Sequence, residues 1–164
     1  VQTVLFRSFG LSLVGVGFAT TVIGAAELLG EGLIAALSDR LGLRHSILLG
    51  GALAGVCYLL LPAVGVSLPL ALAGLFVVFL MGEFTIVGSI SFFTEILPAA
   101  RGTMMAGYFA SASMGRVIGA LLSGPLWTSG GIHAVGWTSA LACAAGLLGL
   151  AWGARRIPPG PPSP

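Results

Sequence analysis

Residues 47–66 read ILLGGALAGVCYLLLPAVGV, a stretch without a single Asp, Glu, Lys, Arg or His. A helix needs about 20 mostly apolar residues to cross a bilayer, at about 1.5 Å of rise per residue. This stretch therefore has the length and composition of one membrane span. It follows the polar segment Ser38–His45 and ends in a tight turn, Gly65–Pro69, whose proline suits the first turn of another helix.

Four further apolar stretches lie on either side of this one. None alternates polar and apolar residues with period two, and all are too long for barrel strands. We therefore expect an all-α fold, a polytopic transmembrane helix bundle. Its five spanning helices are expected at residues 11–37, 47–66, 69–97, 103–127 and 134–154. Residues 1–10 are expected to form an outer loop or the end of a truncated helix, and the Pro-rich residues 155–164 a disordered cytoplasmic tail.

The composition of the 164 residues supports a chain that is surrounded by lipid. Hydrophobic residues make up 57% and charged residues 7%, whereas soluble domains carry about 25% charged residues. A formal net charge of +2 gives no reason to expect nucleic acid as a partner. Cys57, Cys143, His45 and His133 are scattered, with neither a metal-ligand spacing nor a nucleophile–base pair. We therefore expect no metal, no cofactor and no enzymatic activity.

The arginines divide unevenly between the two sides of the expected bundle. Arg7 alone falls on one side, and the other side has Arg40, Arg44, Arg101, Arg155 and Arg156. Basic loop residues accumulate on the cytoplasmic side of membrane proteins. The sequence therefore predicts a multi-pass protein of the cell membrane with a cytoplasmic C-terminus.

Four charged residues fall inside the expected spans: Glu27 and Glu31 in the first, Glu83 in the third and Arg116 in the fourth. A charge at the bilayer centre costs about 2.5–3.5 kcal/mol on insertion scales, so these side chains must face protein or water. One interpretation is an aqueous cavity with proton- or substrate-coupling carboxylates. The other is a structural ion pair of Arg116 with Glu83 or Glu27. We favour Glu83 as this partner because a short loop joins its helix to that of Arg116, which leaves Glu27 as the proton carrier, with Glu31 nearer the inner mouth.

Two loops on the expected cytoplasmic side carry further charges. The first contains Asp39, Arg40, Gly42 and Arg44, and the second contains Glu95, Pro98, Arg101 and Gly102. Arg40 or Arg44 could pair with Glu95, and Asp39 lies where the first and fourth helices are expected to meet. Such a cluster could latch the helices together on the inner side and open when the bundle rocks. The alternative is that these charges only fix the orientation in the membrane.

These loops resemble two motifs of the major facilitator superfamily of transporters. Residues 35–44, AALSDRLGLR, are similar to the G-x-x-x-D-R-x-G-R-R loop that the family places between its second and third and its eighth and ninth helices. Ala35 and Leu43 depart from that pattern. Residues 94–102, TEILPAARG, resemble the E-x-x-P-x-x-x-R-[GA] segment between the fourth and fifth or the tenth and eleventh helices. With the Pro-rich tail, the resemblance implies helices eight to twelve of a twelve-helix transporter.

The resemblance also implies a function and partners. The missing N-terminal half of the same transporter would complete the protein, and a small molecule would be its substrate. We expect a secondary transporter for a small organic solute, an antiporter of the plasma membrane that drives efflux by alternating access in exchange for protons. The alternatives are an uncoupled facilitator or uptake carrier, and a membrane helix module that transports nothing.

Overall fold

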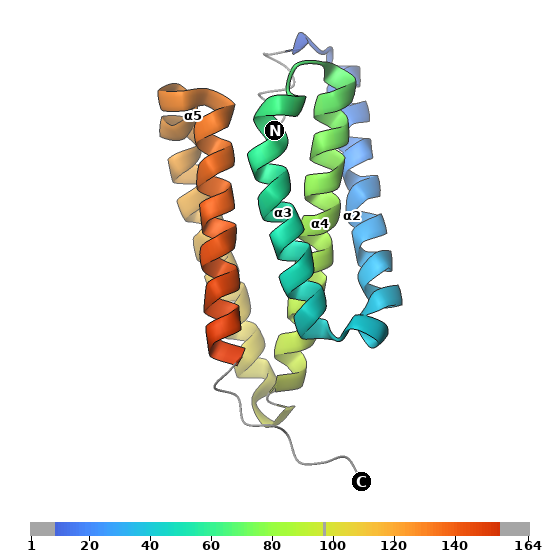
Figure 1. The fold of residues 1–164 in the computed structure, drawn as a ribbon, viewed down its shortest axis with the longest axis vertical. Helices are drawn as coiled ribbons and strands as arrows, with labels where there is room; N and C mark the ends of the chain where they lie inside the picture. The colour runs from blue at the N-terminus through green and yellow to red at the C-terminus, as the bar shows by residue number, and fades with distance from the viewer. Residues whose placement is uncertain (1–8, 97, 155–164) are drawn as a thin grey trace.

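Four long helices dominate the computed structural model, which describes residues 9–96 and 98–154 (Figure 1). They are α2 (Leu13–Leu41), α3 (Leu43–Val64), α4 (Leu68–Ile96) and α5 (Arg101–Ala154), with a short 3₁₀ helix, η1 (Pro98–Ala100), before α5. All four are long and apolar enough to cross a membrane. No strand occurs in the described part, so the expected all-helical fold is confirmed.

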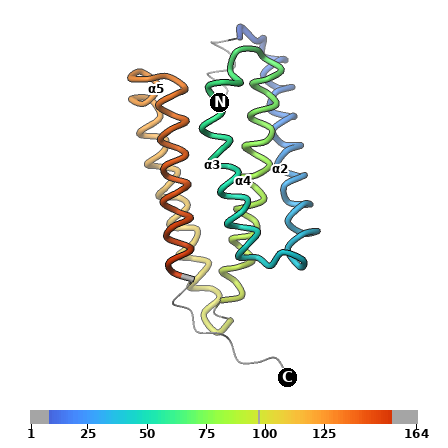
Figure 2. Tube along the Cα trace, viewed as in Figure 1, coloured from blue at the N-terminus to red at the C-terminus, as the bar shows by residue number. Residues whose placement is uncertain are grey.

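Helix α5 contains both of the last two expected spans. Its backbone leaves the helical conformation at Gly131, with φ 58° and ψ −142°. At this point the chain turns back on itself, so that the two parts of α5 lie antiparallel (Figure 2). Glycine adopts positive φ without the steric cost of a side chain. The separate fourth and fifth helices of the sequence analysis are thus joined with almost no loop between them.

The polar segment Ser38–His45 was expected to be a loop, and this expectation was wrong. Helix α2 continues through Leu41 and α3 begins at Leu43, so only Gly42 separates them. Gly42 has φ 75°; its N–H donates to Ser38 O at 2.8 Å, and its carbonyl accepts from Ser46 N at 3.0 Å. Because a positive φ disfavours residues with a side chain, glycine is what permits so short a turn.

The turns alternate between the two ends of the bundle. The turn at Gly42 and the η1 turn lie at one end, and the α3–α4 turn and the Gly131 turn lie at the other (Figure 1). Of the expected end segments, only residues 9 and 10 are described. The expectations for residues 1–8 and for the tail 155–164 lie outside the described part of the chain.

Helix α4 lies between α2 and α3 and packs closely on both. A Cβ atom added at Gly50 of α3 would lie 2.6 Å from the Phe84 ring, and one at Gly88 of α4 would lie 3.2 Å from both Ile34 and Ile47. Small residues bring helices close in lipid, where packing rather than hydrophobic burial drives association. Large apolar side chains such as Leu13 and Leu121 stay 85% and 71% exposed, as expected of a surface that faces lipid.

A proline shapes the contact between α3 and α5. Pro62 lies inside α3 and has no N–H, so the carbonyl of Tyr58 lacks its usual intrahelical donor. Gly136 of α5 packs at this place, and a Cβ atom there would lie 2.6 Å from Tyr58 O. The Tyr58 carbonyl that lacks an intrahelical donor thus lies where α3 and α5 approach closely, and the Cα–H of Gly136 can face it.

Candidate functional site

Helices α2 and α4 approach each other closely at Gly30. A Cβ atom added there would lie 2.6 Å from Leu80 O, 3.1 Å from the Glu83 Cβ and 3.2 Å from Phe84 N. Gly30 itself is buried. Since two of these three neighbours are backbone atoms, the approach depends on the absence of a side chain at residue 30.

This contact brings three acidic residues together. Glu27 and Glu31 flank Gly30 on α2, and Glu83 is among its neighbours on α4. Glu83 interacts electrostatically with both of the other carboxylates. Glu27 and Glu83 are half-buried, and Glu31 is exposed. We call Glu27, Glu31 and Glu83 the acidic cluster.

Arg116 does not form the ion pair with Glu83 that we favoured from the sequence. Within the described residues no ion pair joins the two, and Arg116 is exposed on α5. Tyr108 of α5 contacts α4 instead. Its ring packs against Phe93 with centroids 5.6 Å apart, and its O–H donates to Ile86 O at 3.4 Å. The α4–α5 contact is therefore made by an aromatic residue rather than by an ion pair.

The two sequence motifs, residues 35–44 and 94–102, meet at a second place. A cavity of about 520 Å³ lies between the start of α3 and the ends of α2 and α4. Its walls come from both motifs and include Asp39, Gly42, Arg44 and Glu95. The two motifs, distant in the sequence, thus contribute to the wall of one cavity.

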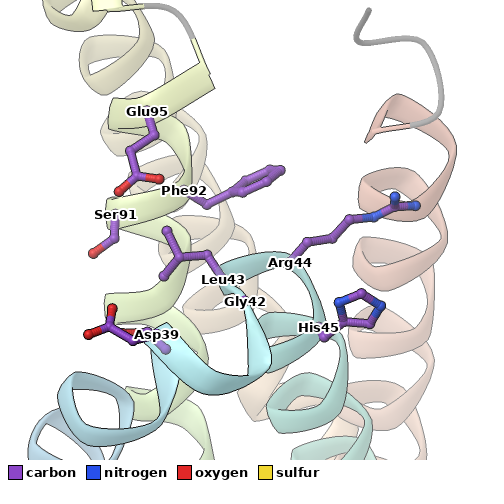
Figure 3. Close-up of a pocket in the computed structure, with 9 residues that line it drawn as sticks. Asp39, Gly42, Leu43, Arg44, His45, Ser91, Phe92 and Glu95 are labelled. Carbon is purple, nitrogen blue, oxygen red and sulfur yellow. The ribbon is translucent and has the colours of Figure 1, made fainter. Parts of the chain in front are cut away.

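The charges around this cavity are arranged differently from the expected latch. Asp39 and Glu95 have their carboxylates on the same side, and Arg44 points the opposite way (Figure 3). No ion pair joins Arg40 or Arg44 to Glu95 in the described part of the chain. Helix α2 packs on α4 rather than on α5, so Asp39 lies beside α4 and not at a junction with the fourth expected helix.

The second motif closes the turn from α4 to α5. The Nε–H of Arg101 donates to Thr94 O at 3.1 Å, and Pro98 begins η1. Gly102 is exposed, and a Cβ atom there would meet nothing within 4 Å. Arg101 therefore holds the end of α4 to the start of α5 through a carbonyl instead of a carboxylate.

Sequence reasoning missed Tyr108 and Gly30. The signal for Tyr108 was available, since Tyr108, Ala112 and Arg116 follow one face of α5 at intervals of four residues. Gly30 and Gly32 both adjoin Glu31, so the sequence alone gives no reason to choose between them. Only the partner helix distinguishes Gly30 from Gly32, whose added Cβ would meet nothing within 4 Å.

The family model of the Major Facilitator Superfamily matches residues 1–164. Among curated proteins, the uncharacterized MFS-type transporter YceJ of Bacillus subtilis (strain 168) is 29% identical over 127 residues, which are 77% of this chain and 32% of that protein. The uncharacterized MFS-type transporter YwfA of the same organism is 27% identical over 135 residues, 82% of this chain and 29% of that protein.

The chain thus spans about a third of the length of these relatives. No solved structure gives a significant match. The match to the family model covers the whole chain, and the helices have the length and apolar character of membrane spans. This chain belongs to the Major Facilitator Superfamily.

Proposed function

We propose that this chain is the C-terminal half of a secondary transporter that moves a small organic solute out of the cell in exchange for protons. The observation that carries the proposal is the acidic cluster, in which Glu83 of α4 interacts with Glu27 and Glu31 of α2. Carboxylates are expensive inside a bilayer, and those found there commonly mark proton or ion pathways.

The charge balance of the cluster favours proton binding. No described cation forms an ion pair with any of its three carboxylates. Like charges repel strongly where water is scarce, and a proton is the smallest species that relieves the repulsion. Binding and release of a proton would change the net charge between two helices, and this change would couple the proton to the outward- and inward-facing states.

The solute site would lie between this half and a second one. In alternating access, the substrate binds near the midplane at the interface of two structural repeats. Arg116 and the small residues near it on α5 are exposed, as a surface that faces the other half would be. In this proposal Arg116 contributes to substrate coupling together with the acidic cluster.

We expect the 164-residue chain alone to transport nothing, because half of the solute site would be missing. Reconstituted into liposomes, it should give no solute flux above protein-free liposomes for any compound in a panel of small organic molecules. The full-length protein that contains the chain serves as the positive control. Saturable flux by a monomeric chain would contradict the two-halves proposal.

The cytoplasmic cavity is the proposed place where the bundle changes shape as it rocks. Asp39 and Glu95 bring like charges together from α2 and α4, so their repulsion opposes closure of the cavity, while Arg101 keeps α4 and α5 joined. In the proposal, Gly42 and Arg44 also line this cavity, and Arg40, Pro98 and Gly102 belong to the neighbouring turns without lining it.

The proposed orientation places the Gly42 turn in the cytoplasm and the Gly131 turn outside. His45 and His133 lie near these turns, and both are exposed. We expect His133→Cys to react with a membrane-impermeant thiol reagent in whole cells, and His45→Cys to react only after the cells are permeabilised. A background without Cys57 and Cys143 provides the control. The reverse labelling would overturn the proposed orientation.

A further inference from the structure

A second cavity, of about 660 Å³, lies between α3, α4 and both parts of α5. Its walls are mostly apolar and include Ile47, Gly51, Phe92, Gly146 and Gly153. The two hydroxyl residues in the wall, Thr85 and Ser89, already donate to carbonyls of their own helix, each at 2.7 Å. The cavity therefore offers no free hydroxyl proton to a ligand and suits an apolar occupant.

Arg44 lines the first cavity and lies one helical turn before Ile47, at the end of α3 that is expected to face the cytoplasm. Arg44, Ile47 and Gly51 fall on one face of α3, at intervals of three and four residues, and the last two line the cavity. Figure 3 shows the Arg44 side chain reaching toward α5, away from Asp39 and Glu95. The guanidinium is thus directed toward α5, which contributes Gly153 to the wall of the second cavity.

The Arg44 side chain has no ion-pair partner within the described residues. The Nε of Arg44 is buried and has no hydrogen-bond acceptor. A buried donor without an acceptor is costly, and a planar guanidinium matches the oxygens of a phosphate group. A guanidinium without an acceptor on its Nε therefore lies on the face of α3 that lines an apolar cavity.

We propose that a phospholipid with an anionic headgroup binds here, with an acyl chain in the α3–α4–α5 cavity and its phosphate at Arg44. An apolar cavity, with a guanidinium one helical turn away near the expected membrane surface, complements both parts of such a lipid. A soluble anion would leave the cavity unfilled, and a fatty chain without a phosphate would leave Arg44 without an acceptor. The site lies apart from the acidic cluster, so it goes beyond the proposed transport function and does not depend on it.

The headgroup contact is tested with the purified 164-residue chain in neutral detergent. Binding of phosphatidylglycerol and of phosphatidylcholine with identical acyl chains is measured by native mass spectrometry. We expect the chain to prefer phosphatidylglycerol, and Arg44→Gln to lower this affinity about fivefold while leaving phosphatidylcholine unchanged. Arg40→Gln removes the same charge from an exposed residue that lines neither cavity, and should keep the preference.

The acyl-chain contact is tested with leucine substitutions. A Cβ atom at Gly146 meets nothing within 4 Å, so Gly146→Leu should fill the cavity without displacing the backbone. It should lower phosphatidylglycerol binding at least as much as Arg44→Gln does. Gly119→Leu is the matched control, because Gly119 is equally unobstructed on α5 but lies outside the cavity. Each variant must melt at the wild-type temperature in lipid-free detergent to be compared.

Three results would overturn the proposal. One is equal binding of the two lipids by the wild-type chain. Another is an unchanged lipid preference in Arg44→Gln. The third is equal binding by Gly146→Leu and Gly119→Leu, which would mean that the lipid only surrounds the bundle. None of these measurements involves transport, so failure here is distinguishable from failure of the proposed function.

Discussion

Glu83→Gln should abolish the dependence of transport on a proton gradient. Glu83 interacts with both other carboxylates of the acidic cluster, whereas Glu27 and Glu31 share one helix. Glutamine has nearly the same shape as Glu83 but no charge. The substitution therefore removes the only charge of the acidic cluster on α4, and α4 no longer responds when Glu27 or Glu31 on α2 binds a proton. For exchange of one proton per solute molecule, a gradient of about one pH unit can sustain a solute gradient of about tenfold. We expect the wild type to build up this solute gradient and Glu83→Gln to build up none.

The measurement uses the full-length transporter in inverted membrane vesicles, with and without an imposed pH gradient. The test solute is one that the wild type moves in a compound panel. Glu83→Asp retains a carboxylate and should keep part of the coupling, which separates loss of charge from loss of shape. Glu31→Gln should have a smaller effect, because Glu31 is exposed.

The assignment of roles within the cluster differs from the one that the sequence favoured. There, Glu83 was the structural partner of Arg116 and Glu27 was the proton carrier. Since no ion pair joins Glu83 to Arg116 in the described part of the chain, Glu83→Gln should leave the melting temperature in detergent nearly unchanged. A large loss of stability would restore the ion-pair interpretation. Full gradient-driven accumulation by Glu83→Gln and by Glu27→Gln would reject proton coupling and favour an uncoupled facilitator.

Gly30→Ala should destabilise the bundle and separate the acidic cluster. The added Cβ atom would lie 2.6 Å from Leu80 O and 3.2 Å from Phe84 N, both backbone atoms that cannot rotate away. The helices must move apart, and such overpacking typically costs about 1–3 kcal/mol. We expect a lower midpoint in detergent-induced unfolding and weaker gradient-driven transport, because Glu83 loses its close approach to α2.

Gly32→Ala provides a matched control on the same helix. Its Cβ atom meets nothing within 4 Å, and alanine is favoured over glycine in a helix interior by about 1 kcal/mol. Gly32→Ala should therefore be neutral or stabilising. Equal unfolding midpoints for Gly30→Ala and Gly32→Ala would show that α2 and α4 are not in backbone contact at Gly30.

Several features of the fold could be predicted from residue order alone. Long apolar stretches such as residues 47–66 and 69–97 predicted helices, and α3 (Leu43–Val64) and α4 (Leu68–Ile96) lie close to those bounds. The boundary between the first two helices was predicted poorly, because the polar residues of Ser38–His45 suggested a loop. The backbone there is helical except at Gly42, since polar side chains at a membrane surface do not by themselves break a helix.

The residues of the candidate site could also be selected from the sequence, but their partners could not. Glu27, Glu83 and Arg116 stand out because a charge inside a span is costly, whatever surrounds it. Their positions along the apolar stretches follow directly from the sequence. Rotation about the helix axis decides which of them meet, and this rotation directs Glu83 to α2 while Tyr108 occupies the α4–α5 contact.

The sequence by itself determined the class of fold, the number and order of the apolar stretches, and the position of each charge along its apolar stretch. The tertiary structure decided that Gly30 and not Gly32 marks the α2–α4 contact, that the three carboxylates gather, and that Arg44 turns away from Glu95. The physical reason lies in the solvent. Lipid tails are as apolar as the leucines that pack between helices, so a lipid-facing residue and a core residue look alike in the sequence. Only the close fit of backbones at small residues distinguishes the two, and that fit depends on two helices at once.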